Sequence, residues 1–231
     1  MSLVKFADLP GKMSSLRRSV FFNPNARSWT APPSVSSERV ASFHQTLPDF
    51  QTTRLVSLND VAKEIGVKAV YLKDESSRLG LPSFKILGAS WGIHQAIARR
   101  LGLAADANFE AIKEAAAGSH IELFAATDGN HGRAVARMAS LLSVPANIYV
   151  PAGMHSATSE LIHQEGAHVI RCGGDYDNTV LSAQRSAKEK GGILIQDYHF
   201  KGGDDEDVPQ VGTDPPLRQC RNDYSQNNEL Y

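Results

Sequence analysis

Two short segments carry the side chains whose types and spacing favour chemistry. The first, K-D-E-S-S-R-L-G-L-P-S-F-K from Lys73 to Lys85, places its last lysine where a helical pattern begins. The positive end of a helix dipole and partial desolvation both favour the neutral, nucleophilic form of a lysine. Such an amine suits Schiff-base chemistry, although a lone lysine after an aromatic residue is more often an ordinary surface residue.

The second segment, T-D-G-N-H-G-R from Thr127 to Arg133, lies between a strand pattern and a helix pattern. Its two glycines let the backbone approach a flat ligand, and Asn130 offers both a donor and an acceptor. Free N–H groups at the start of a helix bind anions, and open parallel sheets bind ligands at the carboxyl ends of their strands. The alternative is a tight strand-to-helix turn in which Asp128 is only the N-cap.

The elements that would hold these segments alternate between strands and helices. Apolar runs at 121–127, 146–150, 168–171 and 193–196 predict strands. Helical patterns predict a helix that Ser83 can N-cap, a second helix at 108–117, and one helix between each pair of successive strands. This alternation predicts an α/β fold with an open, four-stranded parallel sheet and helices on both faces.

The regions outside this pattern differ in character. Residues 1–53 predict an extended arm, because proline, asparagine and serine clusters break any periodicity. A short helix at 59–65 and a short strand at 69–73 follow, so the α/β region is expected to span 54–197. Residues 198–231 combine an acidic run with a polar end, and this composition predicts a disordered tail.

The composition argues against several broad classes of protein. Charged residues make up 21% and hydrophobic residues 42% of the 231 residues, close to a globular average. The net charge of −1 argues against binding to nucleic acid or an anionic membrane, and no apolar run is long enough to cross a bilayer. Two cysteines, Cys172 and Cys220, predict neither a disulfide framework nor a metal site. A cytoplasmic location is therefore expected.

The first segment resembles a signature of the fold-type-II pyridoxal-phosphate enzymes, the tryptophan-synthase-β-like group. Ser83-Phe84-Lys85, followed by Gly88-Ala89, is similar to the S-F-K-x-x-G-A signature of that group. The resemblance implies that Lys85 holds the cofactor pyridoxal 5′-phosphate, with Phe84 beside it. It also implies a fold made of the smaller domain of that group and the N-terminal part of the larger one.

The second segment resembles the asparagine loop of the same group. In that loop the asparagine, here Asn130, bonds the 3′ oxygen of the cofactor. The loop amides of the group hold the carboxylate of a small amino-acid substrate. By resemblance these amides belong to Gly129, His131 and Gly132 here, and a role for the His131 ring as a base is less favoured.

The detailed spelling resembles the diaminopropionate ammonia-lyase family more than the threonine and serine dehydratases. Dehydratases carry serine directly before G-N-H-G, where this sequence has Asp128. The runs L-K-D-E-S-x-R-x-G-L-x-x-F-K, Y-D-N-T-V and I-Q-D are also similar to that family. The resemblance extends from about Arg54 to Asp197.

This resemblance implies a lyase that converts 2,3-diaminopropionate to pyruvate and ammonia, with Asp128 and Asp197 as its catalytic carboxylates. A carboxylate on either face of the substrate can take the α-proton, and a nearby acid can protonate the departing β-amine. Two alternatives stay open: Asp197 as a turn former, and a threonine/serine dehydratase-like lyase. Asp74 and Glu75 are expected to form structural pairs, with Arg78 as a candidate partner.

The resemblance stops at Asp197. The Gly-rich loop that cradles the cofactor phosphate in the group is not recognisable, and the acids after Gly202-Gly203 would repel a phosphate. We therefore expect a C-terminally shortened relative, and a non-catalytic remnant is the alternative to a working lyase. The full-length family implies a homodimer. A dinucleotide-binding fold is disfavoured, because no G-x-G-x-x-G follows a first strand.

Overall fold

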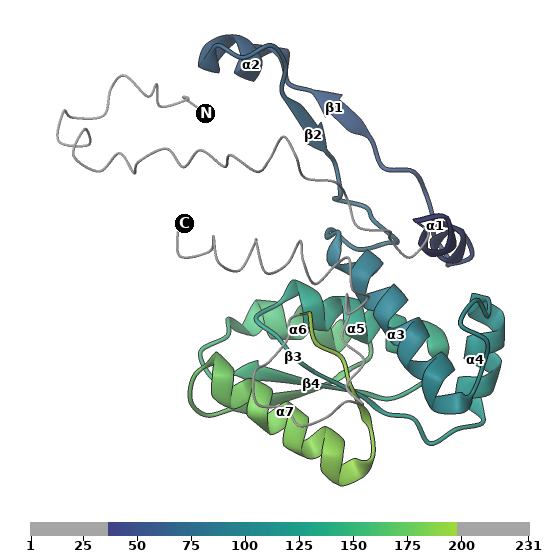
Figure 1. The fold of residues 1–231 in the computed structure, drawn as a ribbon. Coiled ribbons are helices and arrows are strands. Elements are labelled where there is room, and N and C mark those ends of the chain that lie inside the picture. Colours follow the sequence, from purple (N-terminus) through teal and green to yellow (C-terminus); the bar gives the residue numbers. More distant parts are fainter. Residues whose placement is uncertain (1–36, 198–231) are drawn as a thin grey trace, which may run out of the picture. The chain divides into compact units, whose positions relative to one another are not determined.

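The centre of the protein is an open parallel sheet, seen in a computed structural model that describes residues 37–197. Four strands pair in the order β5-β4-β3-β6, as Figure 1 shows in part. The strands are β3 (Leu123–Ala126), β4 (Ala146–Pro151), β5 (His168–Cys172) and β6 (Ile193–Leu194). All residues of β3 are buried, as expected for a central strand with neighbours on both sides and helices on both faces. The predicted four-stranded parallel sheet is confirmed.

Helices cover both faces of this sheet. They are α3 (Lys85–Leu101), α4 (Phe109–Ala117), α5 (Asn130–Leu142), α6 (Ser156–Gln164) and α7 (Tyr176–Lys190). Successive strand residues point to opposite faces, so Leu123 and Ile148 join the core under α3, α5 and α6. Phe124 and Tyr149 join a second core under α7. The predicted two-sided α/β layer is thus confirmed (Figure 1).

A charged cluster ties α5 to the end of α6. The side chain of Glu165, just after α6, is 7% exposed. It accepts hydrogen bonds from Arg133 Nε at 2.9 Å and from Arg137 Nε at 2.5 Å. The cluster fixes the helix that begins at the asparagine loop.

The expectation of an extended arm through residue 53 is wrong for part of its length. Helix α1 (Ser37–Gln45) lies there, because it can bury apolar side chains against α3. Phe43 and Leu47 are 6% and 4% exposed, and the Phe43 ring lies 5.6 Å from that of Trp91. The remainder of the predicted arm, residues 1–36, lies outside the described residues, as does the predicted tail from 198 to 231.

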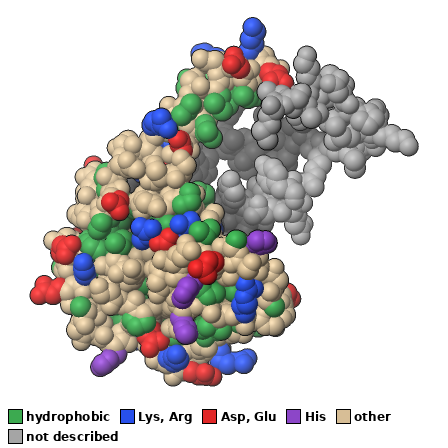
Figure 2. Space-filling view, turned by 180° about the vertical axis from the view of Figure 1, so that it is seen from behind, with side chains coloured by type: hydrophobic (Ala, Val, Ile, Leu, Met, Phe, Trp, Pro, Cys, Tyr) green, Lys and Arg blue, Asp and Glu red, His purple; other side chains and the backbone are tan. Residues whose placement is uncertain are grey.

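A short antiparallel unit precedes the sheet. It consists of β1 (Leu55–Ser57), α2 (Asn59–Ile65) and β2 (Tyr71–Lys73), and Leu55 pairs with Lys73. The predicted helix at 59–65 and the strand that ends at Lys73 are confirmed, whereas β1 is an addition. Leu55, Ile65 and Tyr71 are each more than half exposed, and Figure 2 shows hydrophobic side chains on the surface of this unit. No described helix is long and apolar enough to span a membrane.

Candidate active site

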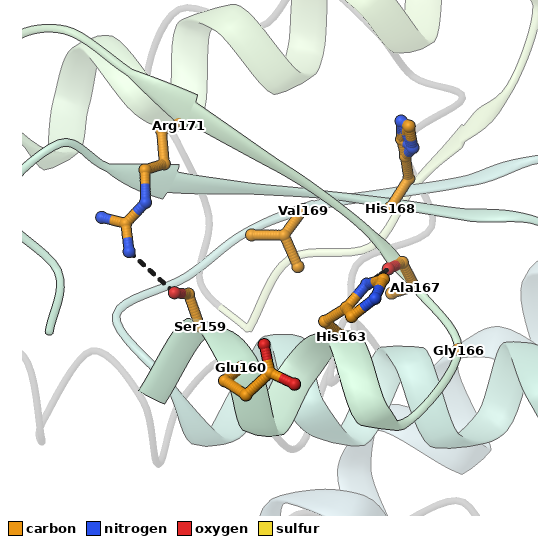
Figure 3. Close-up of a pocket in the computed structure, with 8 residues that line it drawn as sticks. All are labelled: Ser159, Glu160, His163, Gly166, Ala167, His168, Val169 and Arg171. Carbon is orange, nitrogen blue, oxygen red and sulfur yellow. Dashed lines mark hydrogen bonds between the residues drawn. The ribbon is translucent and has the colours of Figure 1, made fainter. Parts of the chain in front are cut away.

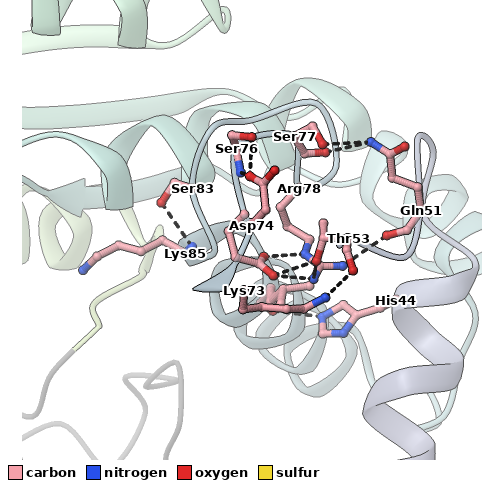
Figure 4. Close-up of polar contacts among 12 residues, drawn as sticks. His44, Gln51, Thr53, Lys73, Asp74, Ser76, Ser77, Arg78, Ser83 and Lys85 are labelled. Atoms are coloured by element: carbon pink, nitrogen blue, oxygen red, sulfur yellow. Dashed lines mark hydrogen bonds and ion pairs between the residues drawn. The ribbon is translucent and has the colours of Figure 1, made fainter. Parts of the chain in front are cut away.

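Lys85 is the first residue of α3, as its sequence context predicts. Ser83 contributes to this helix start, because its Oγ accepts a hydrogen bond from the Lys85 N–H at 3.3 Å. The Lys85 side chain is 37% exposed, and its Nζ contacts Oδ2 of Asp197. Figure 4 shows Lys85 extending away from the polar cluster of the preceding loop. The amine therefore stands at a partly open surface with a carboxylate as its partner.

Asp197 reaches Lys85 from the far end of the described chain, 112 residues later. It follows β6 by three residues, at the carboxyl end of that strand. Its carboxylate also lies 4.0 Å from Nδ1 of His131. Parallel pairing of β6 with β3 brings the segments after both strands to the same edge of the sheet. This pairing is the reason that residues distant in sequence meet here.

His131 is directed into the protein rather than toward solvent. Its side chain is 5% exposed, and its Nε2 lies 3.0 Å from the carbonyl oxygen of Ile195. A carbonyl oxygen only accepts hydrogen bonds, so Nε2 is the nitrogen that carries the proton in the neutral ring. His131 thereby links the asparagine loop to the strand end that carries Asp197.

Thr127 shapes the asparagine loop, and sequence reasoning missed this role. Its Oγ1 accepts hydrogen bonds from the N–H groups of Gly129 and Gly132, both at 2.9 Å. A Cβ on Gly132 would lie 2.8 Å from Cγ2 of Ile148, and Gly129 has a φ of 154°. Glycine is therefore required at both positions. A hydroxyl residue two positions before Gly129 is the signal that could have predicted this turn.

These bonds alter the expected role of the loop amides. The N–H groups of Gly129 and Gly132 were expected to hold a substrate carboxylate, but both already donate to Thr127. In contrast, the N–H of Asn130, the first residue of α5, donates no hydrogen bond within residues 37–197. Asn130 therefore offers the anion-binding amide that a helix start provides.

The structure brings Lys85, Asp197 and His131 together, but it joins neither Asp128 nor Asn130 to them by a contact. Asp128 and Asn130 are exposed after β3, and no ion pair or side-chain hydrogen bond engages them within the described segment. The Phe84 ring, expected beside the cofactor, is 63% exposed at the start of α3. Their accessibility is compatible with ligand contact, and the expected roles stay predictions.

Within residues 37–197, a buried amide next to Asp197 has no hydrogen-bond partner. The side chain of Gln196 is shielded from solvent, and among these residues neither its Nε2 nor its Oε1 is paired. An unpaired buried polar group is unfavourable, so this amide marks a strained point beside the site. Nothing in the sequence pattern distinguished Gln196.

A separate pocket of about 550 Å³ lies between α6 and the edge strand β5 (Figure 3). It contains none of the predicted site residues. Its arginine, Arg171, donates to Ser159 Oγ at 2.7 Å and to the carbonyl oxygens of Ala152 and Met154. The Arg171 guanidinium is thus held by three hydrogen bonds to neighbouring groups. Among residues 37–197, no cluster of three or more His, Cys, Asp or Glu side chains could hold a metal ion.

Comparisons with known proteins identify the family of this chain and several of its relatives. The family described as pyridoxal-phosphate dependent enzyme matches residues 47–210. Diaminopropionate ammonia-lyase of Escherichia coli K12 is 37% identical over 161 residues, which cover 69% of this chain and 40% of that protein. Diaminopropionate ammonia-lyase of Salmonella typhimurium is 34% identical over 174 residues, covering 74% of this chain and 43% of that protein.

A solved structure shares the fold. The crystal structure of the Escherichia coli diaminopropionate ammonia-lyase in complex with D-serine superposes with a TM-score of 0.71 at 31% identity. The superposition covers 87% of this chain and 52% of that chain. The chain thus spans about 40% of the length of the curated relatives that it matches.

Proposed function

We propose that this chain, which belongs to the pyridoxal-phosphate dependent enzyme family, carries catalytic residues of an ammonia-lyase that acts on 2,3-diaminopropionate. One observation carries the proposal: the Lys85 amine at the start of α3 meets the Asp197 carboxylate at the carboxyl edge of the sheet. A primary amine is the group that condenses with an aldehyde, and a carboxylate beside it can exchange protons with it. The identity to two ammonia-lyases supports the choice of substrate.

The residues present fit the reactive end of pyridoxal phosphate. Lys85 supplies a partly exposed primary amine, the group that an aldehyde requires. Gly129 has no side chain and a φ of 154°, so the loop backbone at this position can lie close to a flat ring. Asn130 is exposed at the start of α5, where its amide can bond a ring oxygen. In the proposal Lys85, Asn130 and Phe84 hold the cofactor.

In the proposal, the carboxylates of Asp197 and Asp128 carry out the proton transfers. Pyridoxal phosphate, when bound, supplies an electron sink that makes the α-hydrogen of an amino acid acidic. Asp197 Oδ2, which contacts Lys85 Nζ, is assigned to proton exchange with that amine and with the α-carbon. Asp128 is assigned as the second carboxylate, which serves the opposite face of the substrate and protonates the departing β-amine.

In the proposal, the start of α5 binds the substrate carboxylate. Gly129 and Gly132 shape the loop through Thr127, so the Asn130 N–H is the donor that we assign to the anion, together with the helix dipole. The His131 backbone belongs to the same helix start. The His131 ring keeps the loop in register with the strand end that carries Asp197.

The test measures product release by the 231-residue chain with added pyridoxal phosphate. Pyruvate release from D- and L-2,3-diaminopropionate is compared with keto-acid release from serine and threonine, in the parent chain and in Lys85→Ala. Lys188→Ala, on the exposed surface of α7, is the matched control. Because the chain spans about 40% of its relatives, we expect weak cofactor binding and a low rate.

The outcomes separate the competing functions. Lys85-dependent pyruvate release that prefers diaminopropionate supports the ammonia-lyase, and Asp128→Asn and Asp197→Asn should then each lower turnover by about 10²–10⁴-fold. A preference for serine or threonine supports a dehydratase instead. Cofactor bound to Lys85 without product supports the non-catalytic alternative. Product release that does not depend on Lys85 contradicts the proposal.

A further inference from the structure

The loop that leads into Lys85 is held by a largely buried polar cluster, which we call the loop clamp and define as Thr53, Glu75 and Arg78. Figure 4 shows two of its members, Thr53 and Arg78, close together. Arg78 Nε donates to Glu75 Oε2 and Arg78 Nη2 donates to Glu75 Oε1, both at 2.6 Å. Arg78 Nη2 also donates to Thr53 Oγ1 at 2.6 Å, and Thr53 Oγ1 donates to Glu75 Oε1 at 2.9 Å. Three side chains are thus joined in a closed ring of bonds.

The charged pair of the loop clamp, Arg78 and Glu75, has little access to water. The side chains of Arg78 and Glu75 are 10% and 18% exposed. Hydrogen bonds from Arg78 lower the pKa of Glu75 below its ordinary value, and Glu75 raises the pKa of Arg78. The bidentate geometry depends on the planar guanidinium, which a lysine cannot reproduce.

The clamp adjoins a strained turn. Leu79 has a φ of 48° and Gly80 a φ of 75°, and the Leu81 N–H donates to the Arg78 carbonyl at 2.9 Å. Two successive residues with positive φ form a tight hairpin-type turn, in which leucine is unfavourable. Leu79 and Leu81 are 4% and 2% exposed, so the turn is held by burial as well as by the clamp. Backbone strain of this kind persists where the surroundings enforce it, and it clusters at functional sites.

The first turn of α3 receives support from a second direction. His44 on α1 has its Nε2 2.9 Å from the carbonyl oxygen of Leu87, two residues after Lys85. Ser83 Oγ accepts from the Lys85 N–H. The helix start is therefore fixed by α1 on one side and by the clamped loop on the other.

We propose that the loop clamp is a positioning device for Lys85: it fixes the segment from Asp74 to Phe84 so that the amine stays against Asp197. Thr53, Glu75 and Arg78 are positioning residues, because they act on the amine only through the loop and the start of α3. The inference deepens the proposed function, and rests on it in taking Lys85 as the cofactor lysine.

The test measures the reactivity of Lys85 without any cofactor. The folded 231-residue chain is labelled with a trace amount of acetic anhydride, and peptide mass spectrometry gives the ratio of acetylation at Lys85 to that at exposed Lys188. In the parent chain the contact with Asp197 shields the amine. Asp197→Asn removes that contact and serves as the positive control. We expect it to raise the ratio about twofold to fivefold, the range for an ion pair this exposed.

Variants of the loop clamp should raise the acetylation ratio in the same way. Arg78→Met is expected to raise the ratio as Asp197→Asn does, and the double variant should exceed neither, because both act on one contact. Arg54→Met is the matched control, since Arg54 is 83% exposed and pairs at the surface with Asp74. If Arg78→Met does not fold, Thr53→Val removes the central hydroxyl and Thr53→Ser restores it.

The results separate a positioning role from a purely structural one. A raised ratio in Arg78→Met and Thr53→Val, with Thr53→Ser and Arg54→Met unchanged, supports the proposal. An unchanged ratio in folded clamp variants, even with a lower unfolding midpoint, overturns it, as does an equal rise in Arg54→Met. The proposed function fails by a different observation, namely cofactor that does not attach to Lys85 in the parent chain.

Discussion

Replacing Gly132 with alanine should destabilise the protein, although the same change inside a helix usually helps. Gly132 is the third residue of α5, where alanine would ordinarily gain about 0.5–1 kcal/mol over glycine. Here the new Cβ would lie 2.8 Å from Cγ2 of Ile148 and 3.0 Å from Cβ of Thr127. Both neighbours are buried, Ile148 within β4 and Thr127 directly after β3, so neither can move away freely.

The expected loss of stability is the sum of two unfavourable contributions, less the gain in helix propensity. Overpacking a dense site costs about 1–3 kcal/mol, and loss of the bond from Gly132 N–H to Thr127 Oγ1 costs about 1 kcal/mol more. After the gain in helix propensity is subtracted, we expect a loss of about 1–3 kcal/mol in the free energy of unfolding. At a denaturant slope of roughly 2 kcal/mol per molar urea, the midpoint should fall by about 0.5–1.5 M.

The assay is urea unfolding of the parent chain, Gly132→Ala and Gly153→Ala. Gly153 is the matched control, because a Cβ there would meet no atom within 4 Å. The free energy of unfolding of Gly153→Ala should differ from that of the parent chain by no more than about 0.5 kcal/mol, as is usual for surface substitutions. If Gly132→Ala is as stable as the parent chain, the close approach of loop and strand is not as the structure has it, and the reasoning is refuted.

Three further changes test the packing around the site. Glu165→Ala should lower the free energy of unfolding by about 3 kcal/mol, the lower end for a broken buried pair. Lys190→Ala at a surface pair should cost less than about 1 kcal/mol, and equal losses in urea unfolding would contradict this. Burial lowers the pKa of both His44 and His94, so the unfolded chain binds more protons than the folded chain below about pH 6.5, and the free energy of unfolding should fall as the pH drops through that value. A variant with glutamine at both positions should lose less free energy of unfolding between about pH 7.5 and 5.5. The same pH dependence in the variant and the parent chain would count against buried neutral rings. Gln196→Met should raise the free energy of unfolding by about 1 kcal/mol, because it removes a buried amide that has no partner among residues 37–197. A lower unfolding midpoint would mean that the amide is paired.

The sequence predicted the elements of the α/β layer well, because their periodic patterns are strong. It also predicted Lys85 at a helix start and a structural pair of Glu75 with Arg78, and the structure confirms both. Asp74, the other acid of that expectation, pairs with Arg54 instead. The resemblance to the family was predicted correctly, and the comparisons confirm it.

Other features escaped because they depend on contacts distant in sequence. Helix α1 has a polar composition overall, and only its packing on α3 shows why Phe43 is buried. The bonds from Gly129 and Gly132 to Thr127 are local, yet only the folded geometry shows that these amides are already used. The pairing of Lys85 with Asp197 required the strand order, which no single segment reveals.

The most direct test of the central claim is to identify the lysine that binds the cofactor. The 231-residue chain is incubated with pyridoxal phosphate, reduced with borohydride and mapped by peptide mass spectrometry, with Lys85→Ala and Lys188→Ala as variants. We predict that the reduced adduct forms mainly on Lys85, because this amine begins α3 and faces the carboxyl edge of the sheet. The adduct should persist in Lys188→Ala and be lost in Lys85→Ala. Adduct spread evenly over the exposed lysines, or located mainly on another lysine, would contradict the account.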